Sequence, residues 1–248
     1  MQNKQNGFTL IELSIVLVII ALIVGGMIVG KELLRNSEVK SVIGEYSNYV
    51  QAIANFRDKY QAMPGDFATA TSVFSGTTNG DGNGLIMVNI SGTRLDEQFL
   101  AWQHLYKSEF IKGSYSGSAG SNGARDRVVG TNIPASQLSG AGWGLISVTL
   151  TDIAGGYTEI PYTAPDIPPN HVLWVGGRSV SGAVDSQKPL LSPSEAYDID
   201  KKVDDGLPGN GKVIAQANGT TGTCSSSATA YNITATDLYC ALVFKTGF

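Results

Sequence analysis

Residues 79–84, Asn-Gly-Asp-Gly-Asn-Gly, place side-chain oxygens at alternate positions, a pattern that can bind a hard cation. Asn79, Asp81 and Asn83 match the first, third and fifth positions of an EF-hand loop, with glycine at the sixth. The second half of that loop is missing, because its twelfth position is Ile90 and not a glutamate. A Ca²⁺ site would therefore need carboxylates from elsewhere, and the alternative is a plain glycine-rich turn.

The residues from Ser192 onward predict a short helix. Ser192 suits the N-cap, Pro193 suits the first helical position, and Glu195 completes a capping box. We expect this helix to end at Gly206.

Two acids, Asp204 and Asp205, precede that glycine. The helix dipole is negative there and disfavours each acid by about 0.3–1 kcal/mol, so the pair attracts a cation. Either the adjacent Lys201 and Lys202 supply the positive charge on a solvated face, or the two acids are further Ca²⁺ ligands.

The chain offers little for acid–base or nucleophilic chemistry. Its two histidines, His104 and His171, lie far apart, and the two cysteines, Cys224 and Cys240, are too few for a zinc site. The sequence has no nucleophile elbow, no phosphate-binding Gly-Lys loop and no His-Glu-x-x-His motif. We therefore expect a protein that is not an enzyme.

Amino-acid composition limits the number of domains and the kinds of function that the chain can have. At 42% hydrophobic and 15% charged residues, the 248-residue chain can build a core as one domain or at most two. A net charge of -4 without a basic cluster argues against a dedicated nucleic-acid site.

A long apolar run extends from Phe8 to Val29 with one charge, Glu12. As a helix, these 22 residues reach about 33 Å, enough to cross a hydrocarbon core of about 30 Å. A carboxylate costs about 2.5–3.5 kcal/mol at the centre of such a span and less near its end, so Glu12 needs a partner. A cut after Gly7 would supply one, because the new α-amino group of Phe8 is a cation at the right depth.

Residues 4–13, Lys-Gln-Asn-Gly-Phe-Thr-Leu-Ile-Glu-Leu, and the apolar run resemble the class III signal of type IV pilins and type II secretion pseudopilins. The resemblance implies a prepilin peptidase that cuts after Gly7 and N-methylates Phe8, so that Glu12 becomes the fifth mature residue. In that family the glutamate pairs with the amine of a neighbouring subunit during filament assembly. The resemblance covers roughly the first 65 residues well and the rest only loosely.

A secretory signal peptide and an ordinary single-span anchor fit the apolar run less well. A signal peptide has an apolar region of about 7–15 residues and then a small-residue cleavage site, and the run here has neither feature. A single-span anchor accounts for the length of the run, but not for its carboxylate or the short polar leader that ends in glycine.

Apolar residues continue at helical spacing beyond the run, so we expect one helix from Phe8 to about Gln61, ended by Met63-Pro64-Gly65. The stripe on its second half consists of Val39, Val42, Ile43, Tyr46, Tyr49, Val50, Ile53, Phe56 and Tyr60.

The remaining chain predicts a mixed head. We expect a helix with Thr93 as N-cap, ended by Gly113, whose buried stripe is Leu95, Phe99, Trp102, Tyr106 and Phe110. Short strands are expected at 85–90, 145–150, 172–175, 212–217 and 239–244.

The expected fold is α+β: a long N-terminal helix, transmembrane and then amphipathic, packed on a small antiparallel β-sheet head with extra short helices. Residues 1–7 would be a cleaved leader, and 8–62 a spine helix that lies in the membrane over about 8–29. Residues 63–248 would form a globular head in the periplasm or outside the cell.

The resemblance also bears on Cys224 and Cys240, because many type IV pilins carry a C-terminal disulfide loop of this kind. In an oxidising periplasm the two cysteines should pair, and a loop of about 15 residues is worth about 3 kcal/mol in the chain-entropy model.

We therefore expect a structural subunit of a type IV pilus or pilus-like filament. The alternatives are a type II secretion pseudopilin and a minor pilin that acts as tip adhesin or initiator. The resemblance implies a bacterial inner-membrane precursor with one span, destined for a pilus at the cell surface or for a periplasmic pseudopilus. The implied partners are a prepilin peptidase, identical or related pilin subunits, an inner-membrane assembly platform with its ATPase, and an outer-membrane secretin.

Overall fold

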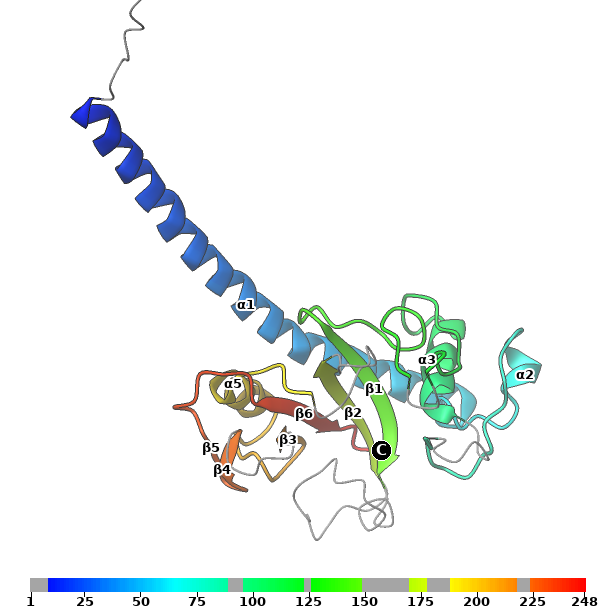
Figure 1. The fold of residues 1–248 in the computed structure, drawn as a ribbon. Helices are drawn as coiled ribbons and strands as arrows, with labels where there is room; N and C mark the ends of the chain where they lie inside the picture. Colours follow the sequence, from blue (N-terminus) through cyan, green and yellow to red (C-terminus); the bar gives the residue numbers. More distant parts are fainter. Residues whose placement is uncertain (1–8, 89–95, 123–125, 149–169, 178–187, 218–223) are drawn as a thin grey trace, which may run out of the picture.

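The structure is a computed structural model that describes residues 9–88, 96–122, 126–148, 170–177, 188–217 and 224–248. Figure 1 shows an α+β architecture in which one long helix projects from a head made of a small antiparallel sheet and short helices. This is the predicted fold class.

The long helix α1 (Leu10–Tyr60) has 51 residues and reaches about 77 Å at about 1.5 Å per residue. It begins with a capping box, in which the Thr9 hydroxyl accepts the Glu12 N–H and the Glu12 carboxylate accepts the Thr9 N–H. It ends where Gln61 adopts a left-handed conformation with φ 53°, just before the predicted stop at residues 63–65. The predicted start at Phe8 lies outside the described residues.

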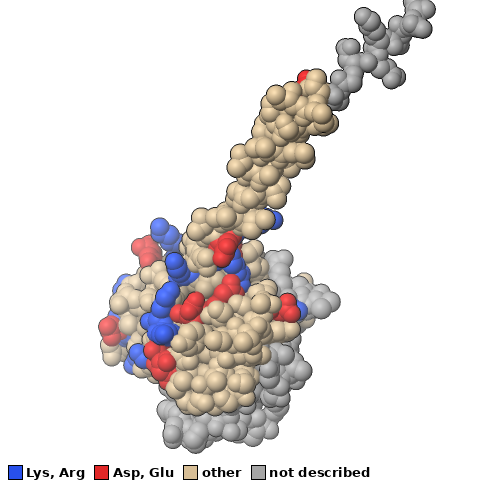
Figure 2. All heavy atoms as spheres, turned by 90° about the vertical axis from the view of Figure 1, so that its left-hand side faces the viewer, with Lys and Arg blue, Asp and Glu red and all other residues tan. Residues whose placement is uncertain are grey.

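The two halves of α1 have opposite environments. Every side chain from Leu10 to Val29 is exposed, and Figure 2 shows this part covered almost wholly by uncharged side chains. In the second half Val42, Ile53 and Phe56 are fully buried against the head. Within the described ranges, α1 is the one helix whose length and composition would allow it to cross a membrane.

Four antiparallel strands form the main sheet, in the order β1-β2-β6-β3. They are β1 (Ala141–Val148), β2 (Asn170–Gly177), β3 (Val213–Ala217) and β6 (Cys240–Lys245). Each overlaps a predicted strand. β1 begins earlier than predicted because Gly144 has no Cβ, which would collide with the indole of Trp174 on β2.

The fifth predicted strand is wrong for residues 85–88, and residues 89–90 lie outside the described part of the chain. The Ile86 N–H bonds to the Ser147 hydroxyl at 2.6 Å, and the Met87 N–H bonds to the Glu97 carboxylate at 3.0 Å. Side chains therefore satisfy donors that a strand ladder would have used.

Three short elements were not predicted: α2 (Ala70–Val73), β4 (Ser225–Ser227) and β5 (Ala230–Tyr231). The two strands pair as a small hairpin. Four residues or fewer give no measurable period, so such elements leave little signal in a sequence.

Helix α3 (Glu97–Lys107) has Asp96 as its N-cap residue, whereas the predicted cap Thr93 and the stripe residue Leu95 lie outside the described residues. The helix stops before the predicted Gly113, because Glu109 adopts a left-handed φ of 64°. Phe99 and Trp102 are buried as predicted, whereas Tyr106 and Phe110 are only partly buried.

Helix α5 (Pro193–Val203) has the predicted Ser192 cap and Glu195 capping box, and it ends three residues before Gly206. The core lies between the second half of α1, the sheet and α3. Its largest fully buried side chains include Trp102, Trp143 and Trp174.

Candidate functional site

The N-terminal end of α1 holds the one acid of the apolar run. The Glu12 carboxylate accepts the backbone N–H and the hydroxyl of Thr9, each at 2.8 Å. The sequence therefore folds locally so that this carboxylate caps its own helix and is fully exposed at the tip. The predicted cleavage residues Gly7 and Phe8 lie outside the described residues, so the cut between them stays a prediction.

The first half of α1 protrudes from the head, and its apolar surface is not buried by any other part of the chain that the structure describes. Its exposed side chains are Leu10, Ile11, Leu13, Ile15, Val16, Leu17, Val18, Ile19, Ile20, Leu22, Ile23, Val24, Met27, Ile28 and Val29. Several hundred Å² of contiguous apolar surface is unusual for a soluble monomer and marks a lipid or protein contact.

A salt bridge joins the spine helix to the head just beyond this surface. The Arg35 guanidinium binds Glu195 through Nε at 2.7 Å and Nη2 at 2.9 Å, and Nη2 also donates to the Leu190 carbonyl at 2.6 Å. Charge-assisted bidentate pairs are geometrically specific, so this contact fixes where α5 sits on α1. The Arg35 guanidinium and the Ser192 N–H hold the pKa of Glu195 below its usual value, against the effect of burial.

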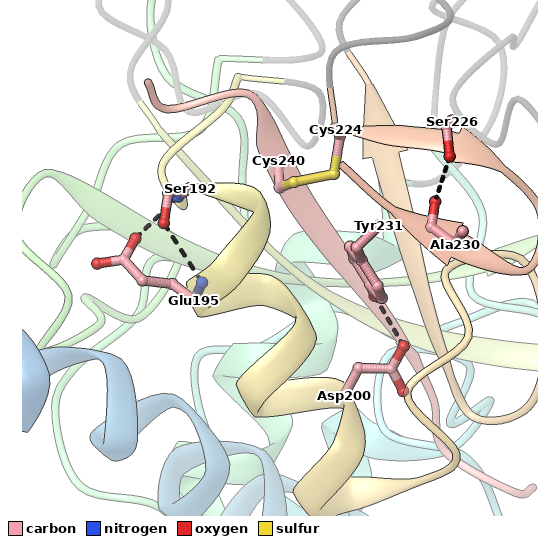
Figure 3. The surroundings of a disulfide bond; sticks show 8 residues. All are labelled: Ser192, Glu195, Asp200, Cys224, Ser226, Ala230, Tyr231 and Cys240. Carbon is pink, nitrogen blue, oxygen red and sulfur yellow. Dashed lines mark hydrogen bonds between the residues drawn. A yellow bond between two sulfur atoms is a disulfide. The ribbon is translucent and has the colours of Figure 1, made fainter. Parts of the chain in front are cut away.

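Cys224 and Cys240 form the predicted disulfide, which Figure 3 shows beside α5. Cys240 begins β6 and exchanges backbone hydrogen bonds with Leu191, just before the α5 N-cap. Within the loop that the disulfide closes, the Tyr231 hydroxyl donates to Asp200 of α5 at 2.7 Å. Disulfide, α5 and β6 therefore form one connected unit.

Three acids meet near the far end of α1. One carboxylate oxygen from each of Asp66, Asp81 and Glu97 lies within 4.8 Å of the others. Asp81 was predicted as a Ca²⁺ ligand, and Asp66 and Glu97 are carboxylates from elsewhere of the kind that a site here would need. The sequence does not reveal these two, because no fixed spacing relates them to residues 79–84.

The two predicted amide ligands of this loop have other partners. Asn79 Oδ1 accepts the Thr71 N–H at 2.8 Å, and Asn83 Oδ1 accepts the Leu85 N–H at 2.8 Å. Asn83 Nδ2 donates to Asp81 at 2.9 Å. The amides therefore shape the loop, and carboxylates provide the candidate cation ligands.

Burial opposes ionisation in this cluster. It raises the pKa of Glu97 to about 7, although backbone N–H groups of Asp81 and Met87 donate to that carboxylate and favour its charged form. Burial likewise raises the pKa of Asp66, which accepts the N–H groups of Asn83 and Gly84. A cation among these carboxylates would reverse both shifts.

A second acid cluster lies at the C-terminal end of α5 and contains Asp200, Asp204 and Asp205. Burial raises the pKa of Asp200 to about 6, partly offset by its bond from the Tyr231 hydroxyl. Asp204 accepts the Lys212 N–H, and Asp205 accepts the Leu207 N–H at 2.8 Å. These bonds order the loop between α5 and β3. Of the predicted Ca²⁺ ligands, Asp81 thus lies in one acid cluster and Asp204 and Asp205 in the other.

Both histidines are buried and hydrogen-bonded. His104 accepts the Gly65 N–H and also bonds to the Thr78 carbonyl, and His171 bonds to the Ser147 hydroxyl at 2.7 Å. Burial lowers the pKa of each imidazole to about 4, which keeps both neutral at physiological pH. Their bonds serve packing in the core.

The family model of the prokaryotic N-terminal methylation motif matches residues 2–28. No curated protein and no solved structure matches the chain. The motif implies processing by a prepilin peptidase and assembly with other pilins, and the apolar helix that follows is compatible with insertion of a prepilin into the inner membrane. At its N-terminus the chain therefore carries a prokaryotic N-terminal methylation motif, the class III prepilin signal found in type IV pilins and pseudopilins.

Proposed function

We propose that the protein is a structural subunit of a type IV pilus or pilus-like filament and acts by assembly, without catalysis. The observation that carries the proposal is the division of α1 into an exposed apolar half with one acid, Glu12, and a half built into the head. The same apolar surface can lie in lipid before assembly and against neighbouring helices afterwards.

Cleavage after Gly7 connects these two states. It removes the leader and places a positive α-amino group on Phe8, four residues before the Glu12 carboxylate. In a medium of low dielectric constant, such a charge from an adjoining subunit is a strong partner for an otherwise unpaired carboxylate. N-methylation of Phe8 keeps that charge.

Mass measurement of the membrane-extracted protein tests the processing step. We expect loss of residues 1–7 and one added methyl group at Phe8. Gly7→Val should block the cut, because it adds a branched side chain at the scissile bond, whereas Gly7→Ala should interfere less. An intact leader on the wild-type chain in cells that process other prepilins would contradict the proposal.

A type II secretion pseudopilin is the second candidate. It is favoured by the two acid clusters, because a head stiffened by Ca²⁺ is a device associated with the major pseudopilin. The disulfide favours the pilus, since it is common in pilins and rare in pseudopilins.

Deletion of the gene distinguishes the two functions. Loss of surface filaments or of adhesion, with normal release of exoproteins, would support the pilus subunit. Retained filaments with blocked exoprotein release would support the pseudopilin. Antibody labelling of sheared filaments then separates a repeated subunit, found along the whole length, from a minor subunit found at the tip.

A further inference from the structure

The sequence contains six Asn-Gly pairs, which are the dipeptides most prone to spontaneous deamidation. In this reaction the glycine nitrogen loses its proton and bonds to the asparagine Cγ, the Cγ–Nδ2 bond breaks, and ammonia leaves. Water then opens the resulting succinimide to aspartate or isoaspartate. Glycine favours the reaction because no Cβ shields its nitrogen or restricts its backbone. A folded chain prevents it where either reacting group is held by hydrogen bonds.

The structure protects the pair at Asn79-Gly80. The Gly80 N–H donates to the Phe67 carbonyl at 3.0 Å, and Asn79 Oδ1 accepts the Thr71 N–H. Gly80 is also buried so tightly that an added Cβ would collide with the Asp66 backbone. Neither the nucleophile nor the electrophile can turn toward the other.

The pair at Asn83-Gly84 is exposed but is held as firmly. The Gly84 N–H donates to the buried Asp66 carboxylate at 2.8 Å, so the attacking nitrogen is occupied. The Asn83 amide is fixed at both ends, by the Leu85 N–H on its oxygen and by Asp81 on its nitrogen. Attack would cost three hydrogen bonds.

Asn210-Gly211, in the loop between α5 and β3, lacks the hydrogen bonds that hold the other two pairs, although the Asp204 carboxylate lies where a Cβ on Gly211 would be. Both residues are exposed, and in the described part of the chain no hydrogen bond engages the Asn210 side chain or the Gly211 N–H. Of these two residues, only the Asn210 N–H donates, to the Leu207 carbonyl at 3.1 Å. In the described residues, therefore, no hydrogen bond holds the amide or the attacking nitrogen away from the other.

We propose that Asn210 is a site of self-catalysed deamidation, which converts its side-chain amide and one water molecule into a carboxylate and ammonia. The product places a new negative charge in the loop that already holds Asp204 and Asp205. The isoaspartyl form also adds a methylene to the backbone at residue 210, three positions before Val213, where β3 begins. The fraction of subunits deamidated at Asn210 should therefore increase with the age of the protein.

Peptide mapping of the aged full-length protein in detergent tests this. Trypsin releases residues 203–212 as a peptide with Asn210 as its one asparagine, and residues 60–94 as a peptide that carries Asn79 and Asn83. After incubation in mildly alkaline buffer, we expect the mass of the first peptide to show that its asparagine has become an acid. This conversion of Asn210 should be several-fold faster than that of Asn79 or Asn83. Asn210→Gln should abolish the new acidic species, and Asn210→Asp should reproduce its charge.

The same incubation in denaturant separates the effect of the folded structure on the deamidation rate from the effect of the local sequence. There we expect all three asparagines to convert at similar rates, because the hydrogen bonds of Asn79 and Asn83 are gone. Conversion of Asn79 or Asn83 as fast as Asn210 in the folded protein would overturn the proposal. So would an Asn210 that stays an amide in the folded protein while the denatured chain converts.

Discussion

Glu12 illustrates how one residue can serve two states of a molecule. In the isolated subunit its carboxylate caps α1 through Thr9, which satisfies two donors at the helix start. This bond needs no second chain, so folding of the helix does not depend on assembly. A carboxylate in an apolar surface still retains capacity for a stronger, charged partner.

We therefore expect Glu12→Leu to leave the head folded while it stops or slows filament growth. The substitution removes the one charge of the span and should increase retention in the membrane. Quantification of sheared filaments against total subunit measures the effect. Glu32→Leu is the matched control, because it makes the same chemical change at an exposed position of α1 beyond the span.

Wild-type filament yield from Glu12→Leu would show that the carboxylate has no part in assembly. An equal loss from Glu32→Leu would show that any added leucine on α1 has this effect.

Among the elements, α5 shows how strongly local signals specify a helix start. Its cap, its first-turn proline and its capping-box glutamate lie within four residues, so the sequence alone predicts where it begins. The acid cluster of Asp66, Asp81 and Glu97 could not be predicted, because these residues approach each other only after α1, α3 and the intervening loop have packed. Asp200 could have been found, since it precedes Asp204 by about one helical turn.

The junction between α1 and α5 gives a prediction about stability. Arg35→Met should lower the free energy of unfolding by about 1–2 kcal/mol, because it leaves Glu195 and the Leu190 carbonyl without their charged donor in a half-buried site. Chemical denaturation in detergent, followed by tryptophan fluorescence, measures the change.

Glu38→Gln is the control for this junction. Glu38 also approaches Arg35, at 3.7 Å, but both side chains are about one-third exposed, so we expect a change of less than about 0.5 kcal/mol. Equal losses from the two variants would mean that general charge balance, and not the bidentate contact, holds the helices together.

For the molecule as a whole, buried carboxyl groups predict a dependence of stability on pH. Glu97 has a pKa raised from 4.5 to about 7, so the folded chain binds this proton more tightly than the unfolded chain does. The stabilisation is present below pH 4.5 and is lost as pH rises through about 7. Glu97→Gln cannot ionise, so the wild-type protein should lose about 3 kcal/mol relative to this variant across that window, at about 1.4 kcal/mol per pKa unit. A constant difference between the two unfolding energies would show that Glu97 does not titrate there.

Added Ca²⁺ probes the same three acids. A divalent cation favours their ionised forms, so at neutral pH we expect Ca²⁺ to raise the unfolding temperature of the wild-type protein more than that of Glu97→Gln. A chelator should reverse the effect. Identical Ca²⁺ responses of the two proteins would show that the cluster binds no cation.

The disulfide should stabilise the head by about 2–4 kcal/mol, because it closes a loop of about 15 residues. The double variant Cys224→Ser, Cys240→Ser removes the crosslink without leaving a free thiol, and its denaturation midpoint measures the loss. Ser226→Ala, at an exposed position in the same loop, should stay within about 0.5 kcal/mol of wild type. An unchanged midpoint in the double variant would show that contacts such as Tyr231 to Asp200 hold the loop without it.

The contacts between α1 and the head determine how the subunit transmits force. Arg35 binds α5, Glu45 accepts the Trp143 indole N–H at 2.7 Å, and the Tyr46 hydroxyl donates to the Lys245 carbonyl at 2.9 Å. These anchors are distributed over about 16 Å of helix, so the head has no single pivot. A pull along the spine loads them together in shear, and the loop closed by the disulfide lies outside that path. We therefore expect the head and the second half of α1 to move together under tension.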